Sequence, residues 1–149
     1  MTRAEAAEAR ALESWQDYQA ALVRAIAPLT AGQMAQRPLP GRRSPGEIAA
    51  HIVFGRALHL SRALGDAAPG ELQPLLAWDD ENAPRTVAEI MHGLDLTWRI
   101  IAGTLMQGQP ADPAFPAAQA IWGLLDHDLP HAGQLSLLLR ANGLPGVEI

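Results

Sequence analysis

The distribution of apolar residues along the chain predicts helices. Between about residues 4 and 29, large apolar side chains recur at spacings of three and four, which places them on one face of a helix. This face comprises Leu12, Trp15, Tyr18 or Gln19, Leu22, Ile26 and Leu29. Charged residues fill the opposite face, as is typical of a solvated surface. Residues 30–43 contain two Pro and two Gly and predict a connection, with a short turn near residues 32–35.

A clear start signal for a second helix lies at residues 44–47, which read SPGE. Ser44 can accept hydrogen bonds from the first free backbone N–H groups, and Pro45 needs no donor at the first helical position. Glu47 can reach back to the cap, so we assign it a structural role. We expect this helix to run to about Leu64 and to end at Gly65.

Two further periodic stretches follow. Residues 66–84 predict a long loop with room for a turn of helix around residues 72–76. A third helix is predicted from about residue 86 to 106, and a fourth from about residue 117 to 142, where Gly143 provides a C-terminal cap. No stretch has the period of a strand. The pattern therefore predicts an all-α protein, a four-helix bundle.

Composition and charge narrow the class of protein. A chain of 149 residues with 48% hydrophobic and 18% charged residues suits a single domain, residues 1–149. It has no Cys, so any metal must be bound through nitrogen and oxygen. The formal charge of −5 and the scattered basic residues argue against a nucleic-acid partner. Without a signal peptide or a membrane-spanning segment, we expect a cytoplasmic protein with no membrane partner.

Candidate chemistry centres on the stretch DHDLPHAGQ, residues 126–134. His127 and His131 are four residues apart, so on a helix they project from one face, which Gln134 continues. Two imidazoles on one face can share a cation. The alternative is a pair of buried histidines that a carbonyl or carboxylate satisfies, since a two-histidine motif needs further ligands to be convincing.

His51 is the candidate for a third ligand, because it lies on the inward side of the second predicted helix, across the bundle. Three uncharged imidazoles in an apolar interior would each lose hydration at a cost of roughly 1–3 kcal/mol, which a shared divalent ion would offset. The sequence therefore favours a metal site made of His51, His127 and His131. His59 and His92 lack a partner at ligand spacing, and we expect them at the surface or partly buried.

Residues next to the two C-terminal histidines carry further expectations. Asp126 and Asp128 flank His127 but are rotated by about 100° from it, so we expect them to face solvent or to orient a ligand. Pro130 removes a backbone donor inside the helix and predicts a kink between the two histidines.

Other residues are candidates for the surroundings of the site. The acidic run Asp79, Asp80 and Glu81 can reach the mouth of the site, although such runs are usually only solvated. Trp78 and Trp122 are candidate pocket walls, although bulky aromatic residues in a bundle usually belong to the core. No residue is identified as a general base.

Two stretches resemble the DinB-like family of four-helix bundles: RPLPGRRSPGEIAAHIV and IWGLLDHDLPHAGQLSLLLRANGLPG. The resemblance covers nearly the whole chain. It implies that the metal ligands are one histidine of the second helix and two of the fourth, which map onto His51, His127 and His131. It also implies a homodimer, and the family includes transferases that use low-molecular-weight thiols such as bacillithiol or mycothiol.

Three functions remain open from the sequence. Three protein ligands leave open coordination positions, which is typical of a catalytic metal and favours a metal-dependent enzyme acting on a small molecule. Such an enzyme would be a hydrolase or a thiol S-transferase. The alternatives are a non-catalytic metal-binding or stress-response bundle, and a structural bundle with buried histidines and no metal. Three imidazoles suit zinc, nickel, copper and iron alike, and we expect zinc or nickel first.

Overall fold

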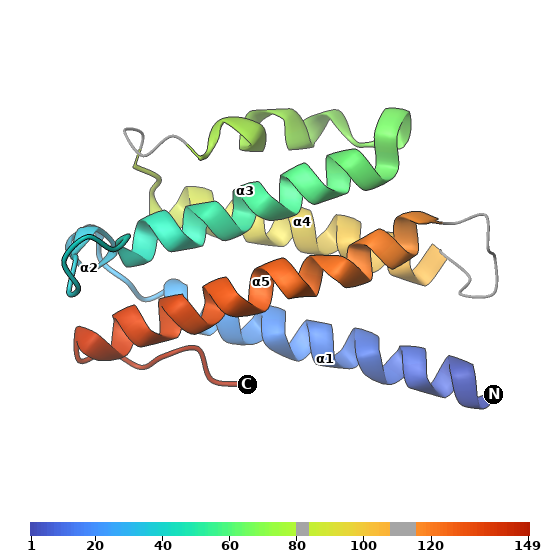
Figure 1. Ribbon diagram of the computed structural model, residues 1–149, viewed down its shortest axis with the longest axis horizontal. Coiled ribbons are helices and arrows are strands. Elements are labelled where there is room, and N and C mark those ends of the chain that lie inside the picture. Colours follow the sequence, from blue (N-terminus) through green and yellow to red (C-terminus); the bar gives the residue numbers. More distant parts are fainter. Residues whose placement is uncertain (80–83, 108–115) are drawn as a thin grey trace.

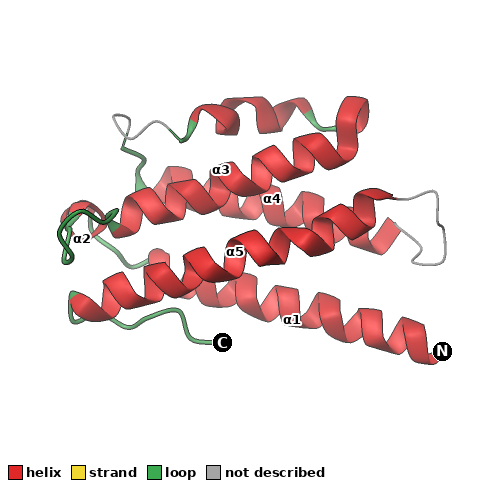
Figure 2. Cartoon of the chain, viewed as in Figure 1, coloured by secondary structure: helices red, strands yellow, loops and turns green. Residues whose placement is uncertain are grey.

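The computed structural model describes residues 1–79, 84–107 and 116–149, and these residues form helices and loops without any strand (Figure 2). The elements are α1 (Arg3–Ile26), α2 (Ala31–Ala35), α3 (Pro45–Leu64), η1 (Gly65–Ala67), η2 (Gly70–Ala77), α4 (Val87–Gln107) and α5 (Pro116–Ala141). The four long helices α1, α3, α4 and α5 are the four that the periodicity predicts. The expectation of an all-α helical bundle is confirmed.

The long helices do not simply alternate in direction. Figure 1 shows that α3 and α4 run the same way, and that α1 and α5 run opposite to them. This is possible because the connection between α3 and α4 contains η2, which packs along α3 and returns the chain to the end where α3 began (Figure 1). Consequently α3 contacts both α4 and α5, and one face of α3 is turned toward α5.

Helix boundaries follow the capping residues. Ser44 accepts a hydrogen bond from the backbone N–H of Glu47, and the Glu47 carboxylate accepts one from the N–H of Ser44, so the predicted capping box is confirmed. Thr2, Thr30 and Thr86 cap α1, α2 and α4 in the same way.

The predicted ends of two helices, the first and the last, can be compared with the structure. The first predicted helix extended to residue 29, but α1 ends at Ile26, because Pro28 cannot continue a helix. At the other end of the chain, Gly143 has a φ of 74° and follows α5, as expected for a glycine cap.

The core lies between the four long helices and under η2. Its largest fully buried apolar side chains include Trp15, Leu22, Ile26, Ile52, Leu60, Leu72, Ile90, Leu94, Ile101, Ile121 and Leu124. They come from every long helix and from η2, which contributes Leu72 to the core. In the described ranges, no helix is long and apolar enough to cross a membrane.

Candidate metal centre

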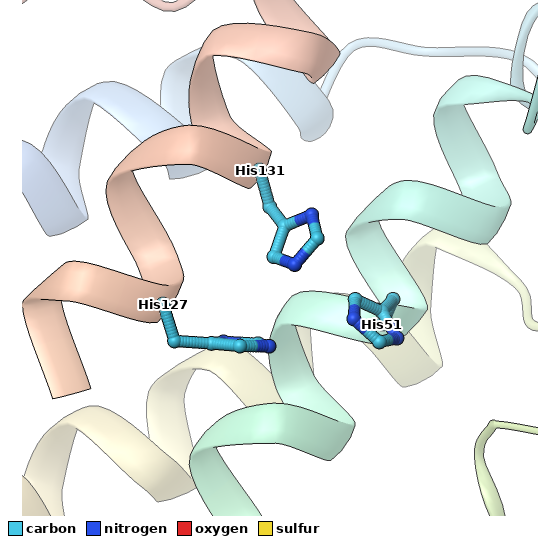
Figure 3. Close-up of side chains that lie close together, drawn as sticks. All are labelled: His51, His127 and His131. Atoms are coloured by element: carbon cyan, nitrogen blue, oxygen red, sulfur yellow. The ribbon is translucent and has the colours of Figure 1, made fainter.

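Three histidines from α3 and α5 lie together between the two helices. His51 comes from the second turn of α3, and His127 and His131 come from successive turns of α5 (Figure 3). Their candidate ligand atoms all lie within 4.8 Å of one another. The ring centroids are 4.5 Å apart for His51 and His131, 4.6 Å for His127 and His131, and 5.3 Å for His51 and His127. The structure thus brings the three predicted residues to one place, where one divalent ion could reach all of them.

The position of the His127 ring depends on a glycine in the facing helix. A Cβ atom added at Gly55 would lie 2.1 Å from Cε1 of His127 and 2.7 Å from Nδ1. These separations are far below an ordinary contact, so any side chain at residue 55 would displace the ring. The absence of a side chain at Gly55 therefore lets α5 bring His127 close to His51.

Two of the three histidines are held by a hydrogen bond on the ring nitrogen Nδ1. Nδ1 of His51 lies 2.9 Å from Oδ1 of Asp79, and Nδ1 of His131 lies 3.1 Å from Oε1 of Gln134. Carboxylate and amide oxygens can only accept, so both histidines carry the proton on Nδ1. Nε2 is left with its lone pair for a metal ion, which is how histidine ligands are usually oriented.

His127 differs from the other two histidines. Its Nδ1 atom is buried and has no hydrogen-bond partner among the described residues. Its nearest ring neighbours besides the other candidate ligands include His59, whose centroid is 5.2 Å away. His59 itself is tied to its own helix, because its Nδ1 lies 2.7 Å from the carbonyl oxygen of Gly55.

The surroundings of His51 and His127 favour the neutral form of the imidazole. Burial lowers the pKa of His51 and His127 below the ordinary histidine value, because removing water disfavours the charged form. The neighbouring His131 lowers the pKa of both further. Metal ions bind the neutral ring, so these lowered pKa values favour the protonation state that a metal ligand requires at His51 and His127.

We expected the three imidazoles in the apolar interior of the bundle, but the structure encloses them only in part. All three rings are half-buried, and His51 and His131 line a cavity of about 550 Å³ that also reaches Gln134. A cavity of this size is typical of a site for a small molecule. The histidines therefore lie where the bundle meets a chamber, so an ion among them would keep access to a ligand.

Behind the histidines lies a buried charge pair that the sequence pattern did not indicate. Arg56 and Asp128 are both completely buried, and Nε of Arg56 donates to Oδ2 of Asp128 at 2.8 Å. Arg56 also donates to Oε1 of Gln19 at 2.7 Å, and the Tyr18 hydroxyl donates to Oδ2 of Asp128 at 3.1 Å. Burial, and then the charge of Asp128, raise the pKa of Tyr18, so this hydroxyl stays protonated. The group ties α1, α3 and α5 together next to Gly55 and His127.

Asp128 therefore requires a correction. The expectation that it faces solvent or orients a ligand is wrong, because Asp128 bonds to Arg56 and Tyr18 instead. Asp126 is exposed, as expected. The available signal was Arg56 itself, which lies four residues after the buried Ile52 and so on the inward face of the second helix.

The acidic run contributes one residue to the site. Asp79, for which the sequence left open a place at the mouth of the site or a merely solvated position, contacts His51. Asp80 and Glu81 lie outside the described residues.

The structure also shows where the remaining candidate residues lie. Trp78 is buried in the core and lines a second cavity of about 580 Å³, and Trp122 is partly buried against the core. His92 is exposed and His59 is partly buried, as expected. The α5 helix continues through Pro130, so the proline does not end the helix between His127 and His131.

These features define an all-α bundle with three histidines from two facing helices at the edge of a cavity of about 550 Å³. Comparison with protein families agrees with this class. The family model of the DinB superfamily matches residues 14–135, and the chain belongs to this superfamily. The match includes all three histidines. Comparisons with curated proteins and with solved structures found no significant match.

Proposed function

We propose that the chain binds one divalent metal ion through His51, His127 and His131 and acts as a metal-dependent enzyme on a small molecule. The observation that carries the proposal is the meeting of three imidazoles beside a cavity of about 550 Å³. Three protein ligands leave coordination positions open, and the cavity gives a substrate access to them. Structural metal sites are normally closed by four protein ligands instead.

The donor set fits zinc or nickel, and two reaction classes use such an ion. When bound, a divalent ion would act as a Lewis acid that lowers the pKa of water for hydrolysis, or of a low-molecular-weight thiol for S-transfer. In both cases His51 and His131 keep their orientation through Asp79 and Gln134. The chamber limits the substrate to a small molecule.

Metal content is the direct test of the proposal. Untagged protein purified without chelators should contain about one divalent ion per chain, as measured by elemental analysis. The variants His51→Ala and His131→Ala should lose it. His92→Ala is the matched control, because His92 is an exposed histidine on α4 and should retain the metal. A wild-type protein that stays metal-free after incubation with zinc and nickel would refute the proposed site.

Turnover separates an enzyme from a metal-binding bundle. The metal-loaded protein should hydrolyse chromogenic esters or amides, or transfer a small thiol to an electrophile such as 1-chloro-2,4-dinitrobenzene. His131→Ala should abolish that activity and His92→Ala should retain it. Stoichiometric metal without turnover of either kind would favour the non-catalytic metal-binding function. Pairing into a homodimer is part of the same proposal, and light scattering would test it.

A further inference from the structure

The chamber beside the histidines has a basic wall that the proposed metal site does not explain. Arg42 and Arg43 line it, together with His51 and His131. None of the residues that line this chamber is acidic, although the whole chain has a formal charge of −5. The positive charge is therefore a local property of this cavity.

A defined turn holds Arg42 at the chamber. Gly41 has a φ of 71°, a conformation that favours glycine, and the backbone N–H of Arg42 donates to the carbonyl of Leu39 at 3.2 Å. The Arg37 side chain donates to the carbonyl of Arg42 at 2.8 Å and also pairs with Glu47. Because Glu47 is part of the cap of α3, the turn is linked to the helix that carries His51.

The two arginines differ in how their charge is used. In the described part of the chain, no carboxylate lies within ion-pair distance of Arg42. Arg43 has only a loose contact, since its Nη2 lies 3.9 Å from Oδ1 of Asp79, which also accepts from His51. Among the residues that the structure describes, the Arg42 guanidinium has no carboxylate partner and can therefore bind an anion, and guanidinium groups match carboxylates well in geometry.

Apart from Gln134, the rest of the lining has no polar side chain. Leu39, Ile48 and Leu138 contribute to the walls between the arginines and the histidines. Such a surface suits a hydrocarbon body, whereas a fully hydrated ion or a sugar would leave these side chains without favourable contacts.

We propose that the chamber recognises a small organic anion whose carboxylate binds Arg42, with support from Arg43, and whose apolar body lies on Leu39, Ile48 and Leu138. The opposite end of such a molecule then lies at His51 and His131. This inference names the substrate class of the proposed metal-dependent enzyme and rests on that function. The recognition itself uses the chain's own arginines and does not need the metal.

A pair of ligands that differ only in charge tests the inference: 3-phenylpropanoate and 3-phenylpropanamide. Their affinities are measured by ligand-observed NMR on metal-loaded and on chelator-treated protein. The carboxylate should bind about tenfold more tightly than the amide to both forms, because only the carboxylate gains a charge-assisted bond to Arg42. Arg42→Gln should remove most of this preference without changing the affinity for the amide, and Arg42→Lys should retain part of it.

Arg99→Gln is the matched control, because it removes a positive charge from an exposed ion pair with Asp95 on α4. It should leave the preference unchanged. Equal affinity for the two ligands, or binding of neither, would overturn the inference. So would a preference that requires metal and survives Arg42→Gln, since the carboxylate would then lie on the metal. A wild type that takes up neither zinc nor nickel on incubation but keeps the carboxylate preference would instead overturn the proposed enzyme function alone.

Discussion

Gly55→Ala is the most informative single substitution, because it adds one methyl group at the point where α3 meets the His127 ring. The new Cβ would lie 2.1 Å from Cε1 of His127, whereas an ordinary contact begins at about 3.4 Å. The ring must therefore retreat by more than an ångström. Metal–ligand distances vary by only about 0.2 Å, so His127 cannot stay in the ligand set.

Two opposing contributions to stability are expected from this substitution. Alanine is favoured over glycine in a helix interior by about 0.8–1.0 kcal/mol. Overpacking against the buried imidazole costs about 1–3 kcal/mol. The free energy of unfolding of the metal-free protein should therefore fall by at most about 2 kcal/mol, and the bundle should remain folded.

Metal affinity should change much more than stability. Removing a group that only orients a ligand typically costs 10–100-fold in affinity, so displacing a ligand should cost more than about 100-fold. Competition with a chromogenic chelator measures this change, and circular dichroism verifies the fold. Gly133→Ala on α5 is the control, because no atom lies within 4 Å of a Cβ added there, and its metal affinity should be unchanged. Wild-type metal affinity in folded Gly55→Ala protein would refute the role assigned to His127.

Three further predictions concern the surroundings of the histidines. Asp79→Ala should weaken metal binding about 10–100-fold in a chelator competition, because His51 loses its acceptor, and an unchanged affinity would contradict that role. Asp128→Asn should lower the free energy of unfolding by about 3–5 kcal/mol in urea, because Arg56 keeps a buried charge without a counter-ion. Replacing both, as Arg56→Met with Asp128→Leu, should recover most of that loss, and a double variant as unstable as the single one would contradict the account. Burial lowers the pKa of His51 and His127 in the folded state, so the unfolded chain binds protons more readily. The metal-free protein should therefore be most stable above the ordinary histidine pKa of about 6.5 and lose stability as the pH falls through and below that value. Urea titrations between pH 8 and pH 5 measure this, and stability that increases toward pH 5 would show that the rings are not held neutral.

The parts of the fold that depend on neighbours in sequence were predictable. Apolar spacing identified all four long helices, and the SPGE start of α3 was located to the residue. His127 and His131 were expected on one face, because residues four apart share a face in any helix, whatever packs against it. Gly143 was recognised as a cap because a C-terminal cap also depends only on residues that are near in sequence.

Apart from the meeting of His51 with His127 and His131, the contacts between distant segments were not predicted. The carboxylate of Asp79 reaches His51 from a loop 28 residues away, and Arg56 meets Asp128 across 72 residues. Periodicity shows which face of a helix is apolar. It does not show how far the helix is rotated about its axis in the bundle, or which residues of a neighbouring helix lie opposite that face.

The sequence by itself thus determined the four long helices, the caps at Ser44 and Gly143, and the three histidines with metal-ligand chemistry. Only the tertiary structure decided that the rings would meet over Gly55, remain half-buried and open onto a chamber with Arg42 and Arg43. The physical reason is the range of the interactions: capping and helical periodicity act within a few residues. The convergence of the site depends on how closely α3 and α5 approach each other, and the packing of the whole core sets that distance.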